Sequence, residues 1–442
     1  MMIALVLLLA LGGTSQAPAR EPGEFRVPAN RADSPAGTLT LRYVRIQSTA
    51  AEPGAPIVLL AGGPGDSGIR VVSTMPAAIL EELLAIADVI AFDQRGTGVS
   101  DPAKPLCPPG ELLPRDRPFD PEATREVLKN RLATCLEGTA ARGIDVRGLT
   151  TDESADDLAA LAATLGVKKL MLMGVSYGTH LALATARRHP GLVDRMALAG
   201  VEGPDDTLKL PSRVEQILEA IAASRRPTLV SEIRQLRTRL AAEPARYTFP
   251  TGRTIVLGEW DLQRWVADAL DSEAEMDAMM AAVPQLLDQD YTVLGRWALT
   301  YRVPRALNLM NLVMDCASYA SDDRLDRITS EAKTAVLGDA INFPLPDLCG
   351  LPGLPRSPDS YREPVRSNLP ALLISGSLDG RTPPANAAAV AETMPNARTM
   401  VIEGASHDLL RRPQTMKAIM AFLRQSRREP GAAVPSTRAS GS

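Results

Sequence analysis

One stretch decides the fold: Lys168-Lys169-Leu170-Met171-Leu172-Met173-Gly174-Val175-Ser176-Tyr177-Gly178-Thr179-His180. Its apolar run ends at Gly174, Ser176 lies between two glycines, and an alanine-rich helical pattern follows. In that strand–turn–helix context, G-x-S-x-G forms a nucleophile elbow, a sharp turn that exposes the serine hydroxyl. The turn demands small residues two places before and two places after the serine, and Gly174 and Gly178 meet that demand. A chance match in a loop is the alternative, and the flanking patterns favour the elbow.

Short apolar runs alternate with helical patterns on both sides of the elbow. Such runs are typical of strands covered on both faces, and they lie at 56–60, 87–92, 195–200, 371–376 and 399–404. Helical patterns lie at 77–85, at 413–424 and after Thr150, where a capping-box pattern opens a helix. The alternation predicts an α/β fold: a mostly parallel central sheet with helices on both faces.

The alternation lapses between Pro204 and Glu363, where amphipathic helical patterns follow one another. We interpret residues 204–363 as an inserted helical cap. The core then comprises residues 20–203 and 364–425. Residues 426–442 are polar and contain Gly, Pro and Ser, which predicts a disordered tail.

The N-terminal region has the features of an export signal. Residues 1–11 form an apolar run that is too short to span a membrane, and Ala17-Pro18-Ala19 supplies a cleavage site. We therefore predict a signal peptide at 1–19, a periplasmic or secreted protein and no stable membrane span after processing. A wrongly assigned start or a buried strand is the alternative. Residues 17–36 are expected to be an extended lead-in, and residues 39–47 alternate as an antiparallel edge strand does.

Four cysteines are consistent with export. They allow two disulfides in three connectivities, and pairing within each region, Cys107 with Cys135 and Cys316 with Cys349, is the economical choice. Four free buried thiols are the alternative. The cysteines lack C-x-x-C spacing and there are only three histidines, so we expect no structural metal site.

A serine hydroxyl needs a base that takes its proton, and the base needs an orienting carboxylate. His180 lies one turn into the helix after the elbow, on the wrong side of Ser176, and His189 is typical of a helix end. His407 follows the last predicted strand, so its loop can bring it to Ser176. A surface-loop histidine is the alternative.

The orienting acid is expected between the serine and the histidine, at the end of the preceding strand. Asp379 is at that place, after the run 371–376. Thr382 has the appearance of a helix N-cap, with Pro383 at the first helical position. A turn aspartate without a catalytic part is the alternative, which the order Ser176, Asp379, His407 disfavours.

The oxyanion of an acyl-transfer reaction needs two hydrogen-bond donors. One is expected to be the Tyr177 backbone N–H, directly after Ser176, and the other Gly63 in the loop Gly62-Gly63-Pro64-Gly65. Glycines let a backbone approach the substrate closely. A tight turn between strand and helix is the alternative.

Five motifs together resemble one family: Gly-Gly-Pro-Gly at 62–65, Asp-Gln-Arg-Gly-Thr-Gly-x-Ser at 93–100, Gly-x-Ser-Tyr-Gly at 174–178, Gly-x-Leu-Asp-x-x-Thr-Pro at 376–383 and Gly-x-Ser-His at 404–407. The chain resembles α/β-hydrolases of the proline iminopeptidase and tripeptidyl aminopeptidase group of serine peptidases. The resemblance implies a triad of Ser176, Asp379 and His407 under a helical cap. It also implies release of an N-terminal residue or short peptide, and a loop-stabilising role for Asp93 and Arg95.

Such an aminopeptidase must hold the ammonium group of its substrate, normally with carboxylates near the cap. Glu202 ends a core strand where the predicted cap begins and is the first candidate. Asp315 is a weaker one. A solvated or capping carboxylate is the alternative for both.

The same scaffold also carries other functions. A carboxylesterase acting on small esters uses the same scaffold, and a non-catalytic scaffold protein is disfavoured by the complete Ser/Asp/His set. Dehalogenase or epoxide hydrolase chemistry would need a carboxylate in place of Ser176. The net charge of -4 and 4% aromatic content argue against nucleic acid as a partner. No phosphate-binding glycine loop with its lysine is present, so the expected partner is a peptide or small amide or ester, without a cofactor.

Overall fold

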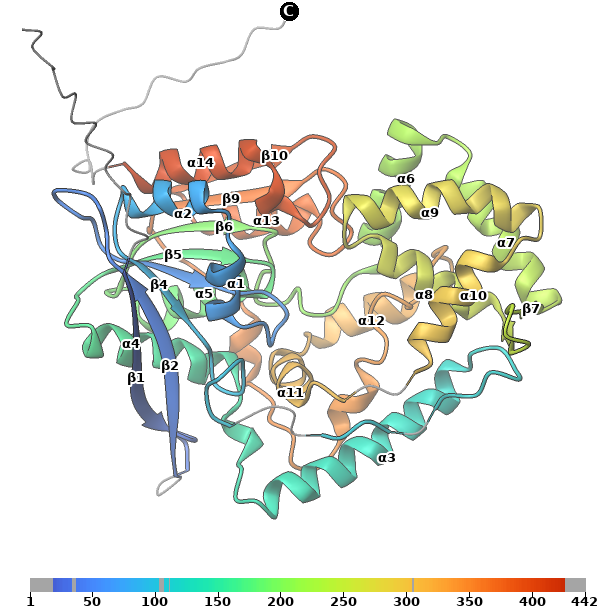
Figure 1. Cartoon of the computed structure of the whole chain (residues 1–442), viewed down its shortest axis with the longest axis horizontal. Helices are drawn as coiled ribbons and strands as arrows, with labels where there is room; N and C mark the ends of the chain where they lie inside the picture. Colours follow the sequence, from blue (N-terminus) through green and yellow to red (C-terminus); the bar gives the residue numbers. More distant parts are fainter. Residues whose placement is uncertain (1–18, 34–36, 103–106, 111, 304–305, 426–442) are drawn as a thin grey trace, which may run out of the picture.

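The computed structural model describes residues 19–33, 37–102, 107–110, 112–303 and 306–425. Its central feature is an eight-stranded sheet with the order β1-β2-β4-β3-β5-β6-β9-β10 (Figure 1). Strands β4 to β10 in this order are parallel, and β1 and β2 are antiparallel additions at one edge. The strands are β1 (Arg20–Pro28), β2 (Thr38–Ile46), β3 (Ile57–Leu60), β4 (Val89–Phe92), β5 (Leu170–Val175), β6 (Val193–Ala199), β9 (Ala371–Gly376) and β10 (Ala397–Ile402).

The inner strands explain the unbroken apolar runs of the sequence. Every residue of β3, β4 and β9 is buried, because helices cover both faces of the sheet. Edge strand β10 is half-exposed, and there Val401 remains 45% exposed. The predicted parallel sheet is therefore confirmed.

The N-terminal prediction was wrong in two respects. The expected extended lead-in contains β1, which pairs along its whole length with β2. Strand β2 is consequently not the edge strand, because it lies between β1 and β4. In β1 only Phe25 and Val27 are buried, so its sequence carries little hydrophobic periodicity.

Helices cover the sheet on both faces. One face packs against α4, α5 and α13, and the opposite face against α1, α2 and α14. The N-cap Thr150 accepts a hydrogen bond from the Glu153 N–H, as the capping pattern predicted. These helices are α1 (Gly68–Thr74), α2 (Ala77–Leu84), α4 (Thr151–Thr164), α5 (Tyr177–Arg188), α13 (Pro384–Ala391) and α14 (Pro413–Leu423), with short 3-10 turn η4 (Leu409–Arg411) before α14.

Residues 204–363 contain helices, a two-stranded hairpin and two 3-10 turns. Helices α6 to α10 lie together beside the sheet (Figure 1) and share a hydrophobic core of their own. The elements are α6 (Pro211–Arg225), α7 (Leu229–Ala242), β7 (Ala245–Thr248), β8 (Thr254–Leu257), α8 (Glu259–Ala269), α9 (Glu273–Leu287), α10 (Thr292–Tyr301), α11 (Leu309–Ser318), α12 (Asp322–Glu331), η2 (Asp347–Gly350) and η3 (Asp359–Arg362).

A segment from the first half of the chain packs against α11 and η2 of this region. Helix α3 (Pro121–Ala140), with 3-10 turn η1 (Val146–Gly148) after it, extends below them (Figure 1). Leu132 and Leu136 of α3 share a hydrophobic cluster with Leu208 and Leu309. This packing crosses the predicted boundary at residue 203.

Both predicted disulfides are confirmed, and both lie in that cluster. Cys107 pairs with Cys135 and Cys316 with Cys349, at Cα–Cα distances of 5.4 and 5.0 Å. The first disulfide fastens α3 to the segment that precedes it, and the second fastens α11 to η2 within residues 204–363. The predicted signal peptide (except residue 19) and the predicted tail lie outside the described residues. Among the helices described, none is long and apolar enough to cross a membrane.

Candidate active site

Ser176 occupies the turn between β5 and α5 in a left-handed backbone conformation, with φ 53° and ψ -128°. A non-glycine residue adopts such a conformation at a cost in strain. The neighbouring glycines make the turn possible. A Cβ on Gly174 would lie 2.6 Å from the Gly178 carbonyl oxygen, and a Cβ on Gly178 would lie 2.1 Å from that of Leu60. The predicted elbow geometry is present.

Substitution of Gly178 tests this steric argument. Gly178→Ala should destabilise the protein by about 1–3 kcal/mol, because the new methyl group meets backbone that cannot move aside. Gly138→Ala is the matched control within helix α3, where a Cβ meets nothing within 4 Å. That change should stabilise by about 0.5–1 kcal/mol. Urea unfolding measures both, and equal effects would contradict the account.

The three residues predicted to act together do lie together. The Nε2 atom of His407 is 3.0 Å from Ser176 Oγ, and its Nδ1 atom is 2.9 Å from Asp379 Oδ2. Because the carboxylate only accepts, His407 Nδ1 carries the proton and Nε2 is free to accept one from Ser176. Each residue follows the carboxyl end of a parallel strand, β5, β9 or β10, which explains how distant parts of the chain meet.

Thr382 has a different role from the one predicted. Helix α13 begins at Pro384, with Pro383 at the N-cap position and no side-chain cap. Thr382 Oγ1 instead donates to Asp379 Oδ2 at 2.7 Å and lies 3.1 Å from His407 Nδ1. The prediction was wrong because it used only the local Thr-Pro pattern of a helix start. The contacts of Thr382 with Asp379 and His407 form only in the tertiary fold.

Asp379 is fully buried and held as an anion. Besides the contacts of His407 and the Thr382 hydroxyl, it accepts the backbone N–H groups of Arg381 and Thr382 at 2.9 and 2.8 Å. Burial alone would raise the pKa of Asp379, but the attraction of His407 and these hydrogen bonds outweigh it and hold the pKa below its ordinary value. A permanent negative charge therefore faces the imidazole.

His407 should control the acidic side of the pH profile. Burial alone would lower the pKa of His407, but the charge and hydrogen bond of Asp379 outweigh burial and hold the pKa above its ordinary value of 6.5. Only the neutral imidazole accepts a proton, so kcat/KM should fall as the pH drops through a midpoint above 6.5. Asp379→Asn should move that midpoint downward. A midpoint at or below 6.5 in the unaltered protein would contradict this reasoning.

The predicted oxyanion donors also border Ser176. Tyr177 is the first residue of α5, so its N–H has no acceptor within the helix. A Cβ on Gly62 would lie 3.2 Å from that of Ser176, so the glycine loop passes directly beside the serine. Gly63, with φ 112°, lines the same cavity as Ser176.

Neighbouring elements hold the glycine loop in place. Asn311 of α11 donates from Nδ2 to the Pro64 carbonyl oxygen at 3.0 Å. Ser67 Oγ donates to Asp93 Oδ1 at 2.6 Å, and the other Asp93 oxygen accepts the Val99 N–H at 2.9 Å. Asp93 thus ties the loop after β3 to the loop after β4.

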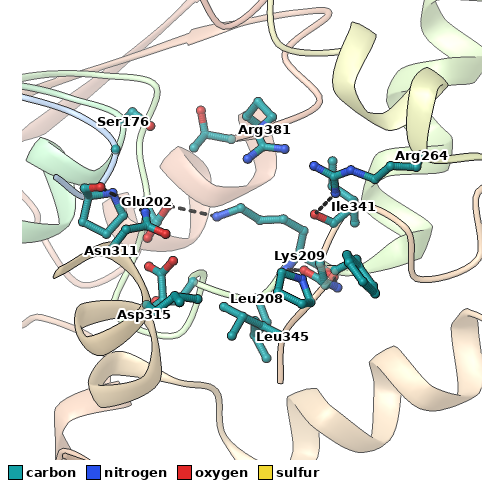
Figure 2. Close-up of a pocket in the computed structure, with 18 residues that line it drawn as sticks. Ser176, Glu202, Leu208, Lys209, Arg264, Asn311, Asp315, Ile341, Leu345 and Arg381 are labelled. Atoms are coloured by element: carbon teal, nitrogen blue, oxygen red, sulfur yellow. Dashed lines mark hydrogen bonds and ion pairs between the residues drawn. The ribbon is translucent and has the colours of Figure 1, made fainter. Parts of the chain in front are cut away.

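A cavity of about 180 Å³ opens at Ser176 (Figure 2). It lies between the loops at the carboxyl edge of the sheet and the helices of residues 204–363. Polar and charged side chains dominate its wall, among them Glu202, Thr207, Lys209, Arg264, Asn311, Asp315, Asn342, Arg381 and Thr382.

Glu202, the predicted ammonium anchor, lines this cavity and is already paired. Lys209 reaches across the cavity (Figure 2), and its Nζ atom is 2.9 Å from Glu202 Oε2. Burial alone would raise the pKa of Glu202, but the charge and hydrogen bond of Lys209 outweigh it and hold the pKa below its ordinary value. Glu202 is therefore a carboxylate with a cation on it.

Asp315, the weaker candidate for the ammonium anchor, lines the same cavity but differs from Glu202 in its protonation state. Burial, reinforced by the negative charge of Glu202, raises the pKa of Asp315 to about 8. Near neutral pH it is a protonated acid that can donate a hydrogen bond.

The two other histidines are structural. His180 is buried with Nδ1 3.0 Å from the Gly203 carbonyl oxygen, so Nδ1 carries the proton, and Nε2 accepts from the Tyr361 hydroxyl at 2.7 Å. Burial lowers its pKa, so it stays neutral. His189 pairs with Asp156 at a helix end. Over the described part of the chain, no group of three or more His, Cys, Asp or Glu side chains is arranged to hold a metal ion.

Sequence reasoning missed several residues of the cavity wall. Lys209, Arg264 and Asn311 come from segments that meet Ser176 only through the tertiary fold. Arg381 carries a signal that could have been used, because it lies two residues after Asp379 in the same turn. Chain position next to the predicted acid places it beside the site.

The chain is similar in sequence to curated peptidases. A tripeptidyl aminopeptidase from Streptomyces coelicolor is 31% identical over 193 residues, which are 41% of this chain and 35% of that protein. The serine protease Hip1 from Mycobacterium tuberculosis is 32% identical over 196 residues, which are 41% of this chain and 36% of that protein. The alignments therefore span about a third of the length of these relatives.

Among solved structures, proline iminopeptidase from Mycobacterium smegmatis matches with a TM-score of 0.42 and 18% identity, covering 91% of this chain and 97% of that one. The names of the two sequence relatives, a tripeptidyl aminopeptidase and a serine protease, agree with the resemblance drawn from the five motifs. The family described as the alpha/beta hydrolase fold matches residues 55–410. The chain belongs to the alpha/beta hydrolase family, as its sequence predicted.

Proposed function

We propose that the protein is a serine exopeptidase that releases an N-terminal residue or short peptide. The observation that carries the proposal is the hydrogen-bonded chain Ser176–His407–Asp379, which opens onto a small cavity beneath a cap. The named peptidase relatives support it at modest identity.

In the proposed reaction, Ser176 Oγ attacks the scissile carbonyl carbon while His407 Nε2 takes the hydroxyl proton. The Tyr177 and Gly63 N–H groups stabilise the resulting oxyanion. His407 then gives its proton to the departing amine, and the C–N bond breaks to leave an acyl-enzyme. A water molecule, deprotonated by His407, hydrolyses the ester and restores Ser176. Asp379 keeps the imidazole in its tautomer and stabilises the imidazolium.

The size and charge of the cavity support removal of a short N-terminal piece. A volume of about 180 Å³ beneath the cap accommodates a small group, and Glu202 supplies a buried carboxylate for a substrate ammonium. The ammonium would share Glu202 with Lys209 or displace it. Protonated Asp315 is nearby and would ionise more readily beside a second cation.

Acetylating the substrate N-terminus tests the exopeptidase assignment. We expect kcat/KM to fall by about 10- to 100-fold when the ammonium is lost, because a charged hydrogen bond is removed. The measurement uses aminoacyl, dipeptidyl and tripeptidyl amides with free or acetylated N-termini. Equal rates for free and acetylated substrates would contradict the assignment.

A companion variant locates the ammonium site. Glu202→Gln should lower kcat/KM for free-amine peptides more than for short acyl esters, which carry no ammonium. Glu243→Gln, an exposed carboxylate at the end of α7, is the matched control. If Glu202→Gln lowers both substrate classes by the same factor, Glu202 is not the anchor.

A carboxylesterase is the second candidate. One observation favours it: Lys209 already neutralises Glu202, and Asp315 is protonated near neutral pH. Among the described residues, the cavity therefore offers no unpartnered carboxylate to an ammonium. Short acyl esters cleaved in preference to every amide of the panel would support this function and contradict the first.

We also infer that the protein works outside the reducing cytosol. The disulfides Cys107–Cys135 and Cys316–Cys349 support this, because such bonds persist in oxidising compartments. Titration of free thiols in the unfolded, unreduced protein tests it, and reaction of any of the four cysteines would count against it.

A further inference from the structure

Arg381 is placed at the reacting centre by the backbone that holds Asp379. Its N–H donates to Asp379 Oδ1 at 2.9 Å, so the residue belongs to the tight turn between Asp379 and Thr382. Its side chain borders the cavity together with Ser176 (Figure 2). Its charge also acts on His407 and on Asp315, lowering the pKa of each against stronger opposing effects. The Arg381 charge therefore acts on both His407 and Asp315.

Lys209 and Arg264, the other two cations of the cavity wall, have close hydrogen-bond and ion-pair partners, whereas among the described residues the Arg381 side chain has a single distant one. Lys209 Nζ donates to Glu202 at 2.9 Å and to the Asp206 carbonyl oxygen at 2.8 Å. Arg264 contacts Asp268 and the Ala340 carbonyl oxygen, each at 2.6 Å.

Within the described residues, Arg381 has one ion-pair partner, Asp271. The two are 3.6 Å apart, with side chains 32% and 58% exposed. An exposed ion pair of that length contributes little. Arg381 is consequently the cation of the cavity that is available to a ligand.

The carboxyl groups of the cavity do not cancel this charge. Glu202 is matched by Lys209, and Asp315 is protonated near neutral pH. Positive charge is left over beside Ser176. A guanidinium binds a carboxylate through two parallel hydrogen bonds, which is its strongest common pairing. The ligand that fits the free charge is a carboxylate.

We propose that Arg381 binds the C-terminal carboxylate of a short peptide substrate, so that free dipeptides and tripeptides are preferred over longer or C-terminally blocked ones. The inference rests on the proposed exopeptidase function and names its substrate class. Glu202 and Arg381 approach the cavity from different elements (Figure 2). A short peptide with both termini charged would pair its carboxylate with Arg381 and its ammonium with Glu202, which Lys209 also contacts.

A second cleft explains why the peptide would be short. This cleft, of about 360 Å³, is also lined by Arg264 and Arg381, so the two arginines stand between it and the inner cavity. Its other charged groups are Asp268, Asp271 and Glu275. Asp268 and Asp271 lie against Arg264 and Arg381, so the three carboxylates outnumber the two arginines by one. The excess negative charge repels a substrate carboxylate that extends past Arg381.

The test compares matched peptides with the full-length protein. Dipeptides and tripeptides of alanine, leucine and proline are offered as free acids and as C-terminal amides, and kcat/KM is measured by chromatography of the products. We expect the free acid to be preferred by about 10-fold or more, since an ion-paired hydrogen bond is gained. Arg381→Gln should bring the ratio of free acid to amide close to one, and Arg381→Lys should restore part of it.

A control variant and the pattern of rates distinguish failure of the Arg381 assignment from failure of the exopeptidase proposal. Arg398→Gln, an exposed arginine on edge strand β10, should keep the ratio of the unaltered protein. Equal rates for free acids and amides in the unaltered protein would overturn the Arg381 assignment alone. A ratio unchanged in Arg381→Gln would also overturn it, because the residue would then act only through the Asp379 turn. Hydrolysis of p-nitrophenyl acetate without cleavage of any peptide would overturn the proposed exopeptidase function together with this inference.

Discussion

His407→Ala should lower kcat by about 10⁴- to 10⁶-fold, as expected when a triad base is removed. Without the imidazole, the Ser176 hydroxyl has no acceptor for its proton at the 3.0 Å position. The departing amine likewise loses its proton donor. Residual activity would come from the oxyanion donors and from substrate binding alone. The fold should survive, because His407 lies in a loop and its side chain is not part of the sheet core.

His189→Gln is the matched control. This histidine pairs with Asp156 at the end of α5, away from the cavity. Its replacement should change kcat by less than about twofold, because surface substitutions away from such features have small effects. Steady-state rates on a chromogenic ester or amide, with circular dichroism to check folding, decide the matter. A folded His407→Ala protein within tenfold of full activity would show that another group is the base.

Arg95→Gln should destabilise the protein by about 3–5 kcal/mol, since it breaks a buried ion pair by removing one partner. Arg95 is fully buried, and its Nε and Nη2 atoms each lie 2.7 Å from an oxygen of Asp157 in α4. Its Nη1 atom donates to the carbonyl oxygens of Gly148 and Ala29 at 2.6 and 3.0 Å. One side chain therefore joins α4, the turn before it and the end of β1.

Urea unfolding measures the loss, with Arg26→Gln as the matched control. Arg26 is exposed on β1, so its replacement should change the free energy of unfolding by less than about 0.5 kcal/mol. In a double-mutant cycle, Asp157→Asn should cost less in the Arg95→Gln background than alone, because the two side chains share one interaction. A loss below about 1 kcal/mol for Arg95→Gln would contradict the role assigned to this pair.

The residues at the carboxyl ends of strands could be found from sequence because their signals are local. The elbow needs Gly174 and Gly178 for steric reasons that any chain must obey. Asp379 and His407 follow buried strands in an order that the parallel sheet imposes, so chain position alone brought them to Ser176. Their proximity is a consequence of topology rather than of any residue nearby in sequence.

The rest of the site could not be predicted because its residues meet only after folding. In the sequence, nothing distinguishes Lys209 from other lysines that precede a helix. Only the folded chain brings its ammonium group to Glu202. Strand β1 and helix α3 were not predicted from the sequence, for a related reason. Each buries few side chains, so neither has the periodicity that marks an amphipathic element. The role of residues 204–363 depends on contacts between distant segments, and sequence patterns do not reveal those contacts.

The most direct test of the central claim is covalent labelling of the folded protein with a fluorophosphonate, followed by peptide mass mapping. A serine activated by His407 should attack the phosphorus, expel fluoride and gain the probe mass at one site, Ser176. The label should be absent from Ser176→Ala and strongly reduced in His407→Ala, while Arg398→Gln labels normally. Absence of label from the folded, unaltered protein, or label on a different serine, would contradict the account.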